Sequence, residues 1–177
     1  TTGDIYLRSA GRIRLDTVTT GNGNEDVNIQ AAGGIDLLAN SDFNDRWILG
    51  STASDLHFVG NTVIAATAFT ADVTGPITQD GLGVAIDTSD ANGAISLTSS
   101  FIGISTQSIV LNPGTGNLAF HAEVGDIWLA VSSGDIVGAR ISNLQADGVN
   151  VVVNLTAQNG SFNLNNLSNF KVANDRV

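Results

Sequence analysis

Acidic residues occur as close pairs at three places in the chain, and paired carboxylates are the groups with which polysaccharide-cleaving enzymes act on a glycosidic bond. For that chemistry the pairs would have to converge on one outer face beside basic groups, which are sparse in this chain. Asp-rich stretches are also what tight turns alone require. The pairs are therefore interpreted as turn residues, and no catalytic residue is assigned: Asp42 with Asp45, Asp87 with Asp90, and Glu25 with Asp26.

The two histidines, His57 and His121, both fall at positions that strand alternation turns outward. His121 shares its face with Glu123, so a metal pair or a catalytic dyad is an alternative to the solvated strand face that we favour. The chain has no cysteine, and it therefore has no disulfide and no thiolate metal ligand. Since no calcium-binding loop motif occurs, we expect no metal and no cofactor, with weak calcium binding at loop corners left open.

Trp128 and Tyr6 are the candidates for ligand binding. Each stands between two aliphatic residues, so alternation within a strand points the aromatic ring away from the core. An outward tryptophan lowers solubility unless it is covered or used. Trp128 could stack on a sugar, pack against a neighbouring fibre, or lie under a loop.

Composition excludes some classes of partner. The net charge is −10, whereas a nucleic-acid partner would need a basic face, so no nucleic acid is expected. Arg8, Arg12 and Arg14 form the one basic cluster and are interpreted as a solvated face. The 42% of apolar residues suffice for one domain covering residues 1–177. No apolar run approaches the roughly 18 residues of a membrane span, so no membrane insertion is expected.

A short unit recurs along almost the whole chain: a glycine, any residue, and then two apolar residues at alternate positions. Period-two alternation is typical of half-buried strands, and no helical periodicity longer than two turns persists. The unit begins at Gly3, Gly11, Gly33, Gly93, Gly116, Gly125 and Gly160, and without the glycine at Glu25, Ser54 and Gln107.

The copies follow one another at intervals of 18 to 23 residues, as from Gly75 to Gly93 and from Gly93 to Gly116. One interval holds two or three short strands, which is one coil of a solenoid. We predict an all-β fold, a right-handed parallel β-helix of about nine coils of roughly 20 residues. A β-sandwich or a propeller is the alternative. Glycine would supply positive backbone angles at the corners. The residues expected to face the core include Leu118, Phe120, Ala122, Val124, Ile127, Leu129, Val131 and Ile136.

Several segments resemble the repeats of filamentous-haemagglutinin-type exoproteins: GDIYLRSAGRIRL, AAGGIDLLANSDF, FTADVTGPITQDG, NGAISLTSS, GDIWLAVSSGDI and LTAQNGSFNL. The resemblance covers nearly all of the chain and is one of repeat style. That family comprises very long bacterial adhesins and toxin carriers, commonly exported by two-partner secretion. The resemblance implies an extracellular or cell-surface bacterial protein, although the family's N-terminal secretion domain is not evident.

Three functions follow as hypotheses. The one we favour is a non-catalytic structural or adhesive rod of a secreted exoprotein. The second is a filament subunit that stacks end to end through open β-helix edges. The third is a carbohydrate-active β-helix, a lyase or a hydrolase, which would need carboxylates and basic groups stacked on one face.

The chain begins without methionine and almost at once inside a repeat, so we expect a segment of a longer chain or a stacking subunit. Its partners would be other copies, or further repeats of the same chain, placed end to end. A glycan or protein of a host surface or matrix is the other expected partner. Loops at residues 41–46 and 87–92 are where we expect insertions that bind.

Overall fold

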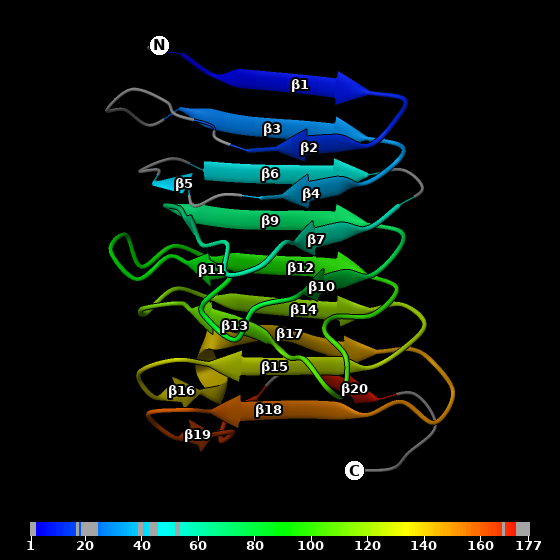
Figure 1. Ribbon diagram of the computed structural model, residues 1–177. Coiled ribbons are helices and arrows are strands. Elements are labelled where there is room, and N and C mark those ends of the chain that lie inside the picture. The colour runs from blue at the N-terminus through cyan, green and yellow to red at the C-terminus, as the bar shows by residue number, and fades with distance from the viewer. Residues whose placement is uncertain are drawn as a thin grey trace.

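The polypeptide winds as a parallel β-solenoid, in which each coil lies on the coil before it (Figure 1). The computed structural model describes residues 3–16, 18, 25–38, 41–42, 46–51, 54–167 and 169–172, and of residues 41, 42 and 51 it describes the backbone alone. Every pairing between its named strands is parallel, and each strand pairs with the equivalent strand of the next coil. The predicted parallel β-helix architecture is therefore confirmed.

Three sheets form the sides of the solenoid. The first has eight strands, in the order β1 (Ile5–Ser9), β3 (Asp26–Ala31), β6 (Arg46–Ser51), β9 (Ala68–Val73), β12 (Ile95–Ser99), β14 (Leu118–Ala122), β17 (Ile141–Ala146) and β20 (Phe170–Val172). The second contains β2 (Ile13–Leu15), β4 (Ile35–Leu37), β7 (Leu56–Phe58) and β10 (Ile77–Gln79). The third contains β5 (Ser41–Asp42), β8 (Ile64–Ala65), β11 (Ile86–Asp87), β13 (Ile109–Asn112), β15 (Ile127–Val131) and β18 (Val153–Ala157).

Smaller elements complete the coils near the C-terminal end of the stack. Strands β16 (Ile136–Val137) and β19 (Phe162–Asn163) pair with each other, and Gly138–Arg140 forms a 3-10 turn, η1. Ile102 makes single parallel bridges to Ile77 of β10 and Ile127 of β15. Through Ile102, the last strand of the second sheet is therefore connected to the third sheet.

The solenoid has about seven turns, not the nine predicted. The eight strands of the first sheet are separated by seven steps, and the steps vary in length. Val27 pairs with Trp47, which is a step of 20 residues, whereas Leu144 pairs with Phe170, a step of 26. At about 4.8 Å per coil, seven turns give a stack about 34 Å long.

The predicted coil count is too high because the glycine pattern occurs at two different corners of the coil. The 18-residue interval from Gly75 to Gly93 does not join stacked positions. Gly75 is instead followed in its column by Ser100, whose N–H donates to the Gly75 carbonyl at 3.0 Å. Gly93 lies at another corner, against Thr67 of the preceding coil. At both corners a glycine stands just before a strand, so the two corners give the same pattern in the sequence.

One continuous core fills the solenoid. Alternate residues of each strand point inward, so β12 and β14 bury their first, third and fifth residues, as the period-two pattern predicts. The inward residues stack in ladders from coil to coil, and each fully buried aliphatic side chain contributes about 1.5–3 kcal/mol relative to exposure. One ladder of the first sheet consists of Leu7, Ile29, Leu49, Ala71, Leu97, Phe120, Leu144 and Phe170.

Val124 was expected to face the core and is instead 67% exposed. Strand β14 ends at Ala122, and the chain then turns, so alternation no longer decides where a side chain points. The N–H groups of Val124 and Gly125 both donate to the carbonyl of Ser100, at 3.1 and 2.8 Å. The other residues of that predicted inward set are buried.

The corner glycines serve two purposes, positive backbone angles and close approach of the coils. Gly34 and Gly134 have a positive φ, of 99° and 81°, which confirms the predicted role in backbone angles at these positions. Gly93 and Gly116 do not, yet a Cβ at either would overlap a backbone carbonyl of the preceding coil, that of Thr67 or of Gly93. At these corners glycine is required because the stacked backbones leave no room for a side chain.

Candidate functional site

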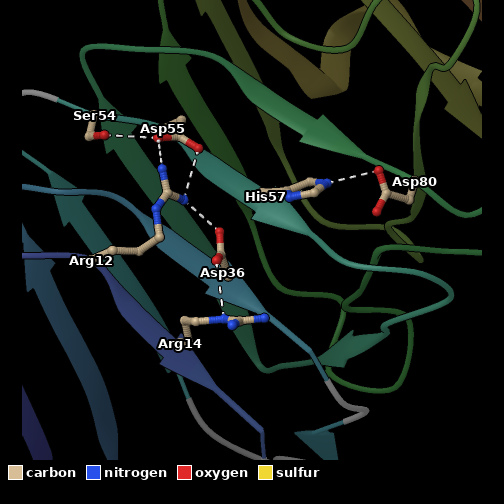
Figure 2. A network of polar contacts seen from close by, with 7 residues as sticks. All are labelled: Arg12, Arg14, Asp36, Ser54, Asp55, His57 and Asp80. Atoms are coloured by element: carbon tan, nitrogen blue, oxygen red, sulfur yellow. Dashed lines mark hydrogen bonds and ion pairs between the residues drawn. The ribbon is translucent and has the colours of Figure 1, made fainter.

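A cluster of ion pairs joins three coils on the outer face of the second sheet (Figure 2). The guanidinium of Arg12 donates to Asp36 at 2.5 Å and, through both terminal nitrogens, to the two oxygens of Asp55 at 2.7 and 3.1 Å. Arg14 lies 3.5 Å from the other oxygen of Asp36. The predicted basic cluster is therefore not simply solvated, because two of its three arginines are paired across coils.

Two carboxylates of this face, those of Asp55 and Asp80, have a lowered pKa. Burial raises the pKa of Asp55, but hydrogen bonds from Arg12 and from the Ser54 hydroxyl outweigh it and leave that pKa below its ordinary value. Further along the same face, His57 Nε2 lies 2.9 Å from Asp80 Oδ1, and this contact lowers the pKa of Asp80 (Figure 2).

A second cluster lies on the outer face of the first sheet, around Asp147, which directly follows β17. Lys171 donates to one of its oxygens at 2.7 Å, and His121 Nε2 lies 2.9 Å from the other. Gln145 also donates to that second oxygen. The hydrogen bonds from Lys171 and then His121 lower the pKa of Asp147 from 3.8 to about 2. Both histidines thus face outward, as predicted, and each contacts an aspartate of the next coil.

The Asp147 cluster predicts a specific loss of stability in acid. A carboxylate whose pKa is lowered by folding stabilises the protein above its ordinary pKa, and this contribution is lost as the pH falls through the lowered value. Asp147→Asn is therefore expected to lower the free energy of unfolding by about 1 kcal/mol at pH 7, since the contacts are partly exposed. The difference from the wild type should disappear between pH 4 and pH 2, as urea titrations followed by circular dichroism would measure.

Asp90→Asn is the matched control for this experiment. Asp90 is exposed, and its carboxylate contacts no partner in the part of the chain that the structure describes. This variant should follow the wild type at every pH. A pH-independent effect of Asp147→Asn would contradict the assignment of acid sensitivity to this cluster.

The acidic pairs behave as turn and pairing residues where they are described. Asp87 accepts hydrogen bonds from the backbone N–H and the hydroxyl of Ser89, at 2.9 and 2.6 Å, as a turn aspartate does. Asp26 is paired with Arg46, at 2.6 Å, on the next coil. Glu25 accepts from the N–H of Gly3 at 3.3 Å. The third pair, Asp42 with Asp45, lies outside the described residues and side chains.

Trp128 faces outward, as predicted, and borders a hollow of about 370 Å³. Its ring is half-buried, and its Nε1–H donates to Asp126 at 3.3 Å. The loop at Gly103 and Ile104 lies along one side of the hollow, so the ring is partly covered. Val124 and Val149 line it as well and are 67% and 76% exposed. The result is a small depression of mixed polar and apolar lining with an aromatic wall.

Tyr6, the other predicted ligand-binding residue, is 67% exposed on the first coil. Its hydroxyl donates to Asp4 at 3.1 Å, and this contact raises the pKa of the phenol. Tyr6 belongs to the first sheet and Trp128 to the third, so the fold does not bring the two aromatic side chains together into one site.

Comparisons with known proteins add no relative. No family model, no curated protein and no solved structure matches the chain. What the sequence and structure establish together is a parallel β-solenoid built of repeats.

The described residues contain no group of three or more His, Asp or Glu side chains that could hold a metal ion. They also form no helix with the length and apolar character needed to span a bilayer.

The two histidine–aspartate contacts have no partner hydroxyl with which to form a nucleophilic triad in the described part of the chain. What the outer faces offer is a set of fixed polar and apolar surfaces on a rigid support. Alternation within a strand predicts the outward direction of the two aromatic side chains, but it does not predict the cross-coil pairings, because pairing depends on the register between coils.

Proposed function

We propose that this chain forms a rigid, non-catalytic rod of a secreted or surface-displayed bacterial exoprotein, similar to the filamentous-haemagglutinin type, and that it displays adhesive surfaces. The observation that carries the proposal is the unbroken set of apolar ladders, which runs through all the described coils and is flanked by polar contacts from coil to coil. Neighbouring coils share both a core and outer ion pairs, and such a stack resists bending.

The state of the acidic side chains supports a role without catalysis. A general acid or base needs a carboxyl group that can reach the substrate. Five of the described carboxylates are instead engaged with a basic side chain of another coil: Asp26, Asp36, Asp55, Asp80 and Asp147. Incubation with a panel of plant, bacterial and animal polysaccharides should therefore release no new reducing ends and no unsaturated sugars.

Cell fractionation of the source material tests where the protein acts. An antibody raised against the purified protein is expected to detect it in the culture medium or on intact cells, and brief protease treatment of intact cells should remove it. A cytoplasmic enzyme detected on the same blot controls for lysis. Detection solely in the cytoplasmic fraction would refute the proposal.

Assembly by end-to-end stacking is a second candidate, favoured by the exposure of inward-facing residues at the two ends of the described stack. Leu7 is 37% and Phe170 is 45% exposed, whereas Leu97, at the centre of the same ladder, is 0% exposed. Such surfaces fit one more coil, supplied either by the same chain or by another copy.

The denatured mass of the native polypeptide separates the two sources of such a coil. A mass far above 18.2 kDa would favour further repeats of the same chain. A mass near that value, together with filaments in electron micrographs whose number grows with protein concentration, would favour stacking of copies.

A further inference from the structure

A groove of about 850 Å³ lies on the first sheet, at the ends of β1, β3, β6 and β9. Its volume is in the range of small-molecule sites, about 300–1,000 Å³. The groove follows one outward column of the sheet, in which each residue pairs with its equivalent on the next coil. This outer column consists of Arg8, Gln30, Gly50, Asp72, Thr98, His121, Gln145 and Lys171.

The two halves of the outer column differ in whether their polar side chains form hydrogen bonds or ion pairs with other residues. In the later coils, His121, Gln145 and Lys171 all contact Asp147. In the groove, the side chains of Arg8, Gln30 and Asp72 have no hydrogen bond and no ion pair with any residue that the structure describes. The groove therefore presents a cation, an amide and an anion that are all available to a ligand.

Gly50 gives the groove its space. It is the one glycine inside a described strand, where a glycine weakens the sheet and often marks a bulge, a bend, or the close approach of a ligand or another backbone. The register on both sides of Gly50 is regular, so no bulge accounts for it. Its φ is not positive, and a Cβ there would meet nothing closer than Cγ of Gln30 at 3.8 Å. Neither backbone angle nor crowding requires this glycine, unlike Gly93. A larger side chain at this position would fill the groove.

The groove's chemistry selects the class of ligand. The backbone groups of its strands are already paired between coils, so an added peptide strand has no backbone partners here and recognition depends on side chains. Arg8 offers a fork that fits a carboxylate. The side-chain amide of Gln30 both donates and accepts hydrogen bonds, and the carboxylate of Asp72 accepts them. Sugar hydroxyl groups, which donate and accept, can bind to both. Ile48, half-buried beside Gly50, supplies the apolar surface on which the face of a sugar ring packs.

The order of the charges sets the orientation. Arg8 and Asp72 lie three coils apart, about 14 Å. A chain of acidic sugars would place one of its carboxylates beside Asp72, which repels it. A ligand with a single acid group at one end meets no such repulsion. We propose that this groove binds an oligosaccharide that carries one acidic sugar, with its carboxylate on Arg8 and the hydroxyls of its neutral sugars on Gln30 and Asp72.

This inference rests on the adhesive part of the proposed function and names its ligand class. The test uses the purified protein and saturation-transfer NMR with three probes: sialyllactose, lactose and trigalacturonic acid. We expect sialyllactose to bind about tenfold more tightly than lactose, since one charged bidentate contact is gained, and trigalacturonic acid to bind more weakly than sialyllactose.

Two variants locate the binding in the groove. Arg8→Gln should weaken sialyllactose about tenfold and leave lactose unchanged. Gly50→Val should abolish binding of both sugars while leaving the melting temperature equal or higher, because valine suits a strand better than glycine. The control is Thr98→Val, one coil beyond the groove in the same column, which should bind as the wild type does.

Absence of binding by the wild type to all three probes would overturn the inference, as would unchanged binding by a folded Gly50→Val variant. Tighter binding of trigalacturonic acid than of sialyllactose would overturn the assignment of a single acidic sugar. None of these outcomes bears on where the protein is found in the cell, so the groove can fail this test while the rod role stands.

Discussion

Replacing Phe69 by alanine is expected to lower the free energy of unfolding by about 3–5 kcal/mol, the cost of removing a phenylalanine from a packed core. Phe69 is fully buried in β9, where its neighbours in the ladder are Trp47 on one side and Ile95 on the other. Its ring also packs against Phe58 of the second sheet, with centroids 6.2 Å apart. The side chain therefore joins three coils and two sheets.

Phe170→Ala is the matched control for this experiment. Phe170 stands in the first sheet too, but in the last described coil, and 45% of it is exposed. Its removal should cost about 1 kcal/mol or less, because the site is already in contact with water. Urea unfolding followed by circular dichroism measures both variants. Equal losses from the two would contradict a core that is tightly packed in the middle of the stack and open at its ends.

The strands that carry the glycine unit could be predicted from the sequence, because their alternation is local. Ile95 and Leu97 are buried and Ser96 faces outward, as a period of two requires. Strand β6 has a weaker sequence pattern, since no glycine precedes it and its first buried residue is Trp47. An inward tryptophan cannot be told from an outward one, such as Trp128, until the phase of the strand is known.

The sites could not be predicted because the coils differ in length. From Arg8 to Gln30 is 22 residues, from Gln30 to Gly50 is 20, and from Gly50 to Asp72 is again 22, with a further step of 26 to Thr98. Loops of different length at the corners shift the register, so residues in one column share no fixed period. The same holds for the Arg12 cluster, whose members are 24 and 43 residues apart.

Gly93→Ala is expected to destabilise the protein by about 3 kcal/mol, although it adds a single methyl group at a turn between two strands. A Cβ at Gly93 would overlap the carbonyl group of Thr67 on the preceding coil. Gly116, on the following coil, is in the same position relative to the carbonyl of Gly93. The atoms that a Cβ would meet at Gly93 and Gly116 are backbone atoms, which cannot rotate away. The overlap is removed if adjacent coils move apart, and that movement breaks hydrogen bonds and opens the core.

The contrast with Gly83→Ala separates close approach from turn preference as the reason for glycine. Gly83 also lies in a turn, its φ is not positive, and a Cβ there would meet no atom within 4 Å. Its substitution should change the free energy of unfolding by about 0.5 kcal/mol or less. If glycine served chiefly to form turns, both variants would lose similar stability in thermal and urea unfolding. A large loss of stability in the Gly93 variant alone would mean that the repeated glycines mark the positions where the coils are in contact. The spacing between coils would then depend on these glycines.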